Sequence, residues 1–393
     1  MPPKDMTARV GTASKSRPEF YRPELDALRF FSFLCIFFHH TLTQPIVNDL
    51  TRQLTVRNTL AMSAKFAVSL FFLLSGYLIT NLLVMEKELT GKVHLGAFYK
   101  RRIARIWPVY YAFTILVLLL GSIVHRLQPS ASAVVAFTLF SGNWFLIFGG
   151  AGFVGGLGIL WSINIEEQFY LVWPLIVRGS ARRSLIWVSI GTIIAAYVVL
   201  LVLGARGIVS DTASRFNPLV EMQFFAAGAL LSVWLPRDGI RLPVGVRLLL
   251  GACGLFCWAA GTRFFGNISP DIVPGIAVSP VLAQWSPAAL YGCVLAGCIA
   301  LFLSFFGLPG RFIPQPIRWL GKISYGLYVY HQLVLTLVPR WPATWEHKAS
   351  LAGLRLCLEL SIAILVAGLS YHWLERPFLR WKERVTFVPN RRV

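Results

Sequence analysis

The sequence predicts an all-α protein: a polytopic bundle of about ten transmembrane helices, with both termini in the cytoplasm. Hydrophobic residues make up 56% of the 393-residue chain and charged residues only 14%, against about 25% charged residues in a typical soluble domain. The mean hydropathy is +0.64. The formal net charge is +20, but the basic residues collect at the ends of apolar segments, which is typical of membrane topology. We therefore expect a lipid bilayer, and no nucleic acid, as a partner.

A helix that crosses the bilayer needs about 20 mostly apolar residues. Residues 1–25 are long and polar, and no small-residue cleavage site follows the first apolar run. They are predicted to form a cytoplasmic tail and not a signal peptide. A single membrane domain is expected over 26–374, and a second cytoplasmic tail over 375–393. The predicted spans are 26–46, 65–85, 106–124, 159–178, 184–204, 217–235, 244–262, 284–306, 319–339 and 351–374.

An eleventh apolar stretch, 131–149, is ambiguous by hydropathy alone. If it does not cross, the predicted inside segments carry 26 of the 37 Lys and Arg residues, the outside segments carry ten, and Arg29 lies within the first span. If it crosses, every later loop changes side and this asymmetry blurs. The positive-inside rule therefore favours a re-entrant or surface segment. Its Gly-rich flanks suit irregular backbone beside a cavity.

All six cysteines lie in apolar stretches: Cys35, Cys253, Cys257, Cys293, Cys298 and Cys357. None has the CxxC spacing that is typical of zinc sites. We interpret them as small packing residues, and no metal site is predicted.

The segment LRFFSFLCIFFHHT (28–41) carries three ionisable residues in the first predicted span. Arg29 and His40 are eleven residues apart, which places them about 20° from the same helix face and ~16 Å apart in rise. His39 points about 80° away from Arg29 and is the weaker candidate. Ionisable groups inside a membrane are costly and usually functional. The alternative for His40 is a buried histidine that bonds to a backbone carbonyl.

Other polar groups are expected at the depth of His40. The segment WSINIEEQFY enters from the outside, so Glu166 and Glu167 lie ~10 Å below the outer surface. His331 reaches a similar depth from the inside. Ser162 and Glu166 share a helix face because they are four residues apart. This convergence predicts a reaction site or a proton relay, in which a carboxylate orients the imidazole of a general base.

Two further motifs have both a structural and a functional interpretation. Arg102 and Arg105 lie one helical turn apart at a predicted cytoplasmic entrance. They form either part of the positive-inside pattern or a clamp for phosphate groups. Ser75 and Gly76 lie in the middle of the SLFFLLSGYLIT segment. Small residues there favour close helix packing.

Taken together, these stretches resemble the acyltransferase family 3 membrane proteins, which O-acylate sugars, glycolipids and some antibiotics. The resemblance covers most of the chain and is strongest over 22–178. It is carried by five motifs in order: Arg29 followed after ten residues by His40, then LFFLLSGYLIT, RRIARIWPVYY, WSINIEEQFYLVWP and ISYGLYVYH. One of these motifs alone would be weak, but the five in this order are specific.

The resemblance implies a multi-pass enzyme of the bacterial inner membrane with no permanently bound cofactor. Its co-substrate would be acyl-CoA, most often acetyl-CoA, and its acceptor a hydroxyl of a carbohydrate, glycolipid or glycosylated small molecule. The expected catalytic residues are His40, Glu166, Glu167 and Arg29. The expected acyl-CoA contacts are Arg102, Arg105, Ser75 and Tyr110. The expected acceptor-side residues are Ser162, His331 and Tyr328.

The predicted mechanism uses His40 as the general base, with Glu166 orienting or charging its imidazole. Arg29 is too far along the helix to touch His40 and is expected to bind donor phosphate or brace the tunnel. A covalent acyl-His or acyl-Ser relay remains an alternative. Which of Glu166 and Glu167 acts is left open.

One departure from the family is visible: many members have an Asp in a GVDLFF segment, where this chain has Ser69 in AVSLFF. The chain is also expected to work without the C-terminal hydrolase-like domain that some members carry. Two rival functions stay open, a proton-coupled transporter and a non-catalytic membrane scaffold. The Pro-rich loop 265–287 is either part of the acceptor pocket or a connector.

Overall fold

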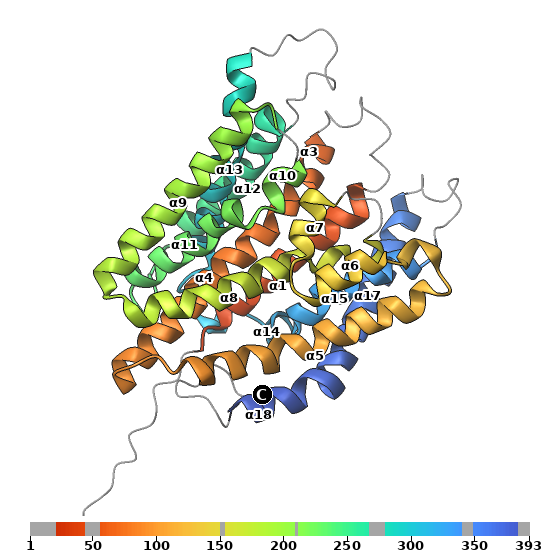
Figure 1. Cartoon of the computed structure of the whole chain (residues 1–393), viewed down its shortest axis with the longest axis horizontal. Helices are drawn as coiled ribbons and strands as arrows, with labels where there is room; N and C mark the ends of the chain where they lie inside the picture. The colour runs from red at the N-terminus through yellow and green to blue at the C-terminus, as the bar shows by residue number, and fades with distance from the viewer. Residues whose placement is uncertain are drawn as a thin grey trace, which may run out of the picture.

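The computed structural model describes residues 21–43, 56–149, 154–208, 211–266, 280–339 and 349–383. Every regular element in these ranges is helical, as the sequence predicts (Figure 1). The first half contains α1 (Pro23–Thr43), α3 (Val56–Ser63), η1 (Ala64–Phe66), α4 (Ala67–Thr90), α5 (Leu95–Gly121), η2 (His125–Leu127), α6 (Ala131–Thr138), α7 (Gly142–Phe148), η4 (Gly155–Leu160) and α8 (Trp161–Gly179). The second half contains α9 (Arg182–Ala205), α10 (Asp211–Arg215), α11 (Pro218–Trp234), α12 (Val244–Phe265), α13 (Pro280–Phe305), η5 (Gly310–Phe312), α14 (Gln315–Lys322), α15 (Ser324–Leu337), α17 (Ala349–Ser370), η6 (Tyr371–Glu375) and α18 (Arg376–Glu383).

Helical structure covers each of the ten predicted spans, but not all of these helices have the length and hydropathy of a span. Within the described residues, seven helical stretches do: Pro23–Thr43, Val56–Thr90, Leu95–Gly121, Arg182–Ala205, Val244–Phe265, Gln284–Phe305 and Leu351–Trp381. The chain is therefore a multi-pass membrane protein. The count of about ten spans and the side on which the termini lie stay predictions. Residues 267–279 of the predicted outer loop 265–287 and most of both tails fall outside the described residues, while 280–287 form the start of α13.

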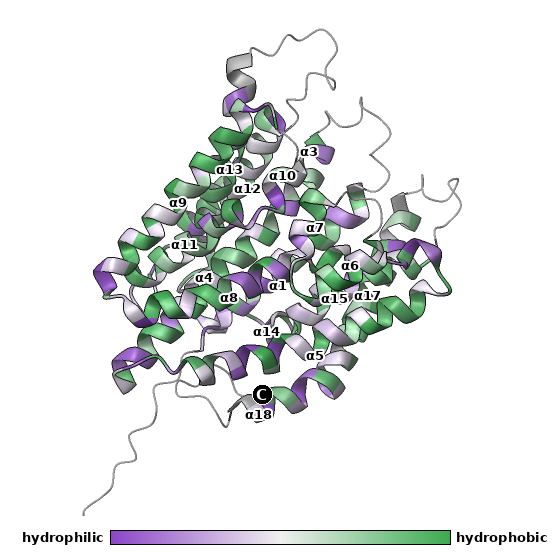
Figure 2. Cartoon of the chain, viewed as in Figure 1, coloured by the Kyte–Doolittle hydropathy of each residue, from purple (hydrophilic) through white to green (hydrophobic). Residues whose placement is uncertain are grey.

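The three remaining helices, α8, α11 and α15, are short or polar. Helices α11 and α15 are mostly buried inside the bundle, and α8 is buried over its first turns but exposes Leu171, Val172 and Leu175. Helix α15 has 14 residues and a length of about 21 Å, less than the ~30 Å hydrocarbon core. Helix α11 has 17 residues, most of them buried. Helix α8 carries Glu166 and Glu167, and Figure 2 shows a hydrophilic stretch where it crosses the middle of the molecule. Such helices do not need the hydropathy of a lipid-facing span.

Helix α4 forms the centre of the fold. In the span that contains it, 83% of the most apolar window is buried, against 22% in α9 and α12 on the periphery. A Cβ atom added to Gly76 of α4 would lie 2.1 Å from the carbonyl oxygen of Phe225, and one added to Gly228 of α11 would lie 2.0 Å from that of Leu73. The two backbones are therefore in direct contact. This confirms the close helix packing predicted at Gly76.

Two groups of helices flank this centre (Figure 1). On one side, α11 packs against α9, and α13 packs against α9 and α12. On the other side, α1 packs against α14 and α15, α15 packs against α17, and α18 packs against α5. Helices α1, α4, α5, α8 and α15 surround the space between the two groups, where the polar side chains of the predicted site meet.

The ambiguous stretch 131–149 does not form one spanning helix. It folds into the short helices α6 and α7, of eight and seven residues, which pack against each other. Each is far shorter than a bilayer-spanning helix. Phe140, between the two, adopts a positive φ of 54°, which breaks the helix. The two short helices agree with the prediction that this stretch is not a spanning helix, and whether it crosses the membrane stays a prediction.

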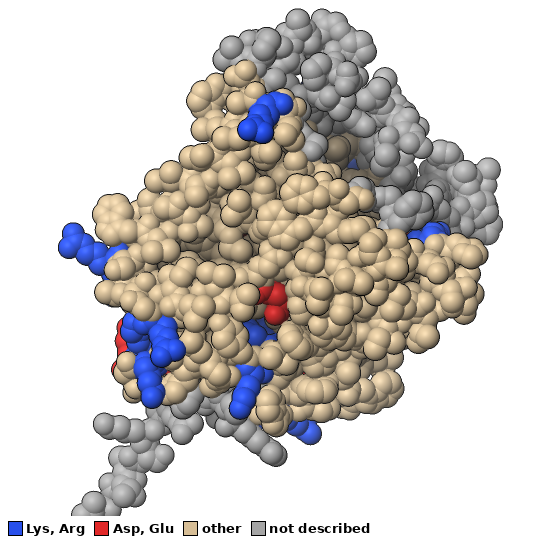
Figure 3. All heavy atoms as spheres, in the orientation of Figure 1, with Lys and Arg blue, Asp and Glu red and all other residues tan. Residues whose placement is uncertain are grey.

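Charged side chains are distributed unevenly over the surface. In Figure 3 most of the visible Lys and Arg atoms lie along the lower and left margins, while the middle of this face carries one acidic group with basic atoms just below it. A one-sided distribution of basic residues is what the positive-inside rule predicts.

Candidate active site

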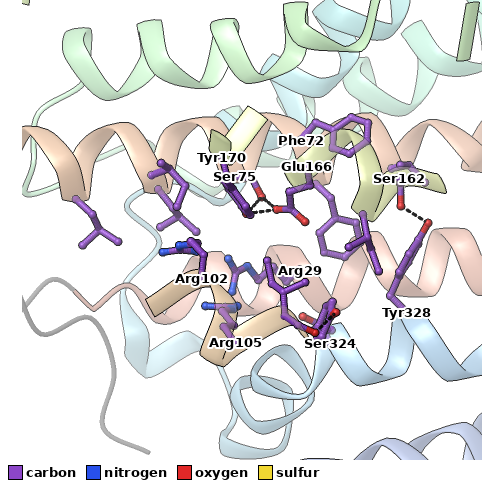
Figure 4. A pocket seen from close by; sticks show the side chains of 18 residues that line it. Arg29, Phe72, Ser75, Arg102, Arg105, Ser162, Glu166, Tyr170, Ser324 and Tyr328 are labelled. Atoms are coloured by element: carbon purple, nitrogen blue, oxygen red, sulfur yellow. Dashed lines mark hydrogen bonds between the residues drawn. The ribbon is translucent and has the colours of Figure 1, made fainter. Parts of the chain in front are cut away.

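A cavity lies between α1, α4, α5, α8 and α15. Its wall combines apolar side chains, mainly from α4, with polar side chains that come from all five helices (Figure 4). They are Arg29, Ser75, Arg102, Arg105, Ser162, Glu166, Tyr170, Ser324, Tyr325 and Tyr328. An apolar pocket with a few convergent polar groups is the usual form of a ligand site.

Three arginines converge on this cavity: Arg29 from α1, and Arg102 and Arg105 from α5. None of them forms an ion pair with a carboxylate in the part of the chain that the structure describes. With Glu166 as the single acidic group in the wall, three arginines and one glutamate leave a formal charge of +2. Burying unpaired cations is costly. A wall with this excess of positive charge favours an anionic ligand.

The neighbouring Arg101 has a different, structural role. Its guanidinium lies 2.7 Å from the carboxylate of Glu86, which is buried. Glu86 also accepts a hydrogen bond of 2.8 Å from the backbone N–H of His94, at the start of α5. The sequence KRRIAR thus divides into one arginine that fixes the α4–α5 corner and two, Arg102 and Arg105, that face the cavity. The guanidinium of Arg102 lies over the rings of Phe98 and Tyr170, 5.4 and 5.2 Å from their centroids.

Glu166 accepts hydrogen bonds from Ser75 and Tyr170 (Figure 4). These three residues form a compact polar group in the cavity wall, opposite the arginines. The predicted pairing of Glu166 with His40 is therefore wrong for this structure. The helix rise was a sound guide to depth, but depth does not fix the direction of a side chain, and two hydroxyl groups on α4 and α8 hold this carboxylate on the cavity side.

Glu167 and Tyr110 point away from the cavity. Glu167 accepts a long hydrogen bond of 3.5 Å from the indole N–H of Trp107. Tyr110 is fully buried, and its hydroxyl lies 2.6 Å from the carbonyl of Phe137 and 2.7 Å from the side-chain oxygen of Asn164. The prediction that Tyr110 contacts the donor does not agree with this position. It ties α5 to α6 and α8 instead.

Ser162 of α8 and Tyr328 of α15 close the end of the cavity that lies away from the arginines (Figure 4). Their hydroxyl oxygens are 2.6 Å apart, and the Tyr328 hydroxyl donates to the carbonyl of Ile159 at 3.2 Å. Ser162 and Glu166 both line the cavity, so the predicted sharing of one helix face is confirmed.

The histidines lie beyond this closed end and do not line the cavity. The ring of His40 is 5.3 Å from that of His331 and 5.1 Å from that of His39, measured between centroids. The Nδ1 atom of His39 lies 2.9 Å from the carbonyl of Ala61, so this ring anchors α1 to α3. The predicted convergence of His40 and His331 at one depth is thus confirmed. No group of three His, Cys, Asp or Glu residues in the described ranges could hold a metal ion.

Comparison with known proteins identifies the family. Residues 22–371 match the model of the acyltransferase domain of family 3. The chain belongs to the acyltransferase 3 family. The resemblance inferred from the five motifs is therefore confirmed over nearly the whole chain, and no solved structure matches significantly.

Curated relatives in this family carry names that specify an activity. The chain is 24% identical over 380 residues to the peptidoglycan O-acetyltransferase OatA of Listeria monocytogenes, covering 91% of this chain and 56% of the relative. It is 26% identical over 390 residues to the putative peptidoglycan O-acetyltransferase YrhL of Bacillus subtilis, covering 92% and 56%. It is 25% identical over 400 residues to the O-acetyltransferase OatA of Staphylococcus aureus, covering 95% and 60%. The chain thus spans little more than half the length of these relatives.

The position where many acyltransferase 3 proteins have Asp contacts a different carboxylate in this member. The hydroxyl of Ser69 on α4 donates to Glu221 of α11 at 3.2 Å, and Tyr291 of α13 donates to the same carboxylate at 3.3 Å. All three residues are buried. A carboxyl group therefore lies beside position 69 here as well, but α11 supplies it.

The sequence analysis missed several residues of the site. Tyr170 lies four residues after Glu166 in the WSINIEEQFY motif, so the helical spacing could have found it. Ser324 and Tyr325 line the cavity from the start of α15, two positions that the ISYGLYVYH motif contains. Arg215, on the short helix α10, lies over the rings of Trp161 and Phe216. No pattern in the sequence indicated Arg215.

Proposed function

We propose that this protein is a membrane O-acyltransferase that moves an acyl group, most often acetyl, from acyl-CoA to a hydroxyl of a carbohydrate acceptor. Membership of the acyltransferase 3 family supports the reaction class. The observation that carries the donor is the cavity with three arginines and a formal charge of +2. A phosphorylated donor supplies the anion that such a wall requires.

In this proposal the CoA phosphates bind Arg102 and Arg105, with Arg29 as the third cation. The pantetheine arm follows the apolar wall of α4 towards the end of the cavity that Ser162 and Tyr328 close. Arg29 and His40 are separated by ~16 Å of helix rise. A donor with phosphates at one end of a long arm and a thioester at the other fits two sites placed in this way.

The transfer step needs one base and one leaving group. The acceptor hydroxyl attacks the thioester carbonyl carbon while His40 takes its proton. The tetrahedral intermediate collapses, the C–S bond breaks, and the CoA thiolate takes the proton back from His40. The products are the acyl ester and free CoA. Because the cavity ends at the Ser162–Tyr328 pair, Tyr328 must move aside or the arm must pass beside it.

Glu166 acts in the cavity in this proposal, through the hydrogen bonds from Ser75 and Tyr170. A carboxylate that holds two hydroxyl groups can position them against the donor, and it limits the positive charge of the wall. Glu167 faces Trp107 and is given a supporting role only.

For the acceptor, the names of the relatives point to the polymer class. Two of them are named as acting on peptidoglycan. We therefore propose peptidoglycan, or a carbohydrate of the same kind, as the first acceptor to test. The transporter function is not favoured, because family membership supports group transfer.

The test is acceptor-dependent release of CoA by the purified protein in proteoliposomes. Acetyl-CoA is supplied with and without soluble peptidoglycan fragments, and free thiol is measured. We expect His40→Ala to abolish acceptor-dependent release, with a loss of roughly 10²–10⁴-fold. The exposed His125→Ala variant is the matched control and should keep wild-type activity. If the folded His40→Ala protein kept normal activity, the assignment of the base would be wrong.

A further inference from the structure

His331 is the most enclosed histidine of the site. Its side chain is fully buried on α15, with the ring of Phe33 edge-on at 5.8 Å and that of Tyr328 at 5.9 Å. The third ring against it is His40, at 5.3 Å. The two aromatic contacts restrict the His331 ring, and only the His40 contact involves a second group that can exchange a proton.

Its hydrogen bonds fix the tautomer of His331. The Nδ1 atom lies 2.7 Å from the backbone carbonyl of Tyr328. A carbonyl oxygen can only accept, so Nδ1 carries the hydrogen, and in the neutral ring the lone pair is on Nε2. This Nε2 atom is buried and has no hydrogen-bond partner among the described residues. An unsatisfied buried acceptor costs about 1–3 kcal/mol, so its retention calls for an explanation.

The position of His40 explains why the Nε2 atom of His331 is left without a partner. Two imidazole rings with centroids 5.3 Å apart, tilted by 45°, can bring a nitrogen of each within hydrogen-bond reach. His40 is partly exposed. Within the described ranges its ring contacts other rings, and no hydrogen bond joins it to another residue. The His331 ring therefore has an unused acceptor, Nε2, and the neighbouring His40 ring has an unused N–H donor.

We propose that His331 is the positioning residue of His40, in the place that the sequence analysis gave to Glu166. The Nε2 atom of His331 accepts the N–H of His40, which leaves the other nitrogen of His40 unprotonated and turned to the acceptor hydroxyl. When His40 takes the proton, the same hydrogen bond becomes charge-assisted and holds the imidazolium. This inference rests on the proposed function of His40 as the base.

The backbone of α15 links this pair to the donor cavity. Tyr328 fixes the His331 ring through its carbonyl, and its hydroxyl meets Ser162 at the closed end of the cavity. One residue thus sets both the end of the donor site and the orientation of His331.

The experiment compares variants that keep or remove the acceptor atom at position 331. His331→Phe keeps the ring shape without an acceptor, and His331→Asn keeps a donor for the Tyr328 carbonyl but is too short to reach His40. His331→Gln places an amide oxygen near the position of Nε2. We expect Phe and Asn to lower kcat by roughly 10–100-fold, part of the 10²–10⁴-fold of a general base, with the KM for acetyl-CoA unchanged. Gln should restore most of kcat.

Tyr330→Phe is the matched control on the same helix. It removes the phenol that accepts a hydrogen bond of 3.2 Å from Ser370, away from His40, and should leave kcat unchanged. If His331→Phe or His331→Asn folds and keeps wild-type kcat while His40→Ala is inactive, the inference is overturned and the proposed function stands. Equal losses in the Gln and Asn variants also overturn it. If His40→Ala itself is active, the proposed function has failed first. In the His40→Ala background, His331→Phe should cause no further loss.

Discussion

Removing Arg102 and Arg105 together tests the proposed donor site most directly. Both guanidinium groups face the cavity and neither has a carboxylate partner in the described part of the chain, so their loss leaves no unpaired acid behind. A hydrogen bond to a charged group contributes about 1.5–3 kcal/mol. One such bond from each arginine gives about 3–6 kcal/mol, a weakening of roughly 10²–10⁴-fold in Kd. Arg29 remains in the double variant, so residual binding is expected.

The assay is binding of acetyl-CoA to the purified protein in detergent, without acceptor, for the wild type and for Arg102→Ala/Arg105→Ala. Acetyl-pantetheine, which has no phosphate, is the matched ligand. The two proteins should bind it equally, because the arginines act on phosphate. Lys100→Ala is the matched protein control, since this exposed lysine is on the same helix and does not line the cavity.

Three results would count against this reasoning. If the Lys100→Ala variant lost as much affinity as the double variant, the effect would come from the general charge of this end of α5. If the double variant bound acetyl-CoA as the wild type does, the cavity would not hold the donor phosphates. A folded wild-type protein that does not bind acetyl-CoA would count against acyl-CoA as the donor.

Three further predictions follow from single contacts. Glu166→Gln removes the one acidic group of the cavity wall, so acetyl-CoA should bind more tightly while kcat falls about tenfold or more. Glu167→Gln should change both the affinity and kcat less. Steady-state kinetics of the two variants would show the reverse order if Glu167 acts. Gly76→Ala puts a Cβ 2.1 Å from a backbone oxygen of α11 and should destabilise the protein by about 1–3 kcal/mol in thermal unfolding. Gly191→Ala is the control and should be neutral, because its Cβ meets nothing within 4 Å. Ser69→Asp, which introduces the acid found in many relatives, should lower the unfolding temperature, because it buries a second carboxylate beside the one that Ser69 contacts; an unchanged temperature would argue against this contact.

Much of the fold could be predicted from hydropathy and charge. Long apolar runs located the peripheral helices α9, α12 and α17, since these face lipid and must be apolar over their whole length. The positive-inside rule also favoured a non-crossing segment at 131–149, where the chain forms two short helices. Hydropathy predicted spans at 217–235 and 319–339 but not that α11 and α15 have only 17 and 14 residues, because a helix that is covered by other helices has no minimum length or hydropathy.

The site was predictable where helical spacing alone decides. Arg102 and Arg105 share a face, as do Ser162 and Glu166, and all four line the cavity. Spacing could not show which partner a side chain selects across helices. The carboxylate of Glu166 is held by Ser75, 91 residues earlier in the chain.

Length, polarity and function are linked in the helices that surround the cavity. Helices α8 and α15 are too polar or too short to be stable as isolated spans, yet they carry Glu166 and His331. They can do so because α4, α5 and α11 pack against α8, while α1, α5 and α17 pack against α15. Their polar groups also find partners in one another, such as the hydroxyls of Ser162 and Tyr328. In a multi-pass protein, a predicted span whose helix is too short or too polar for the bilayer is therefore a good place to look for the active site. In this chain that rule selects α8, α11 and α15, and two of the three, α8 and α15, meet at the end of the donor cavity.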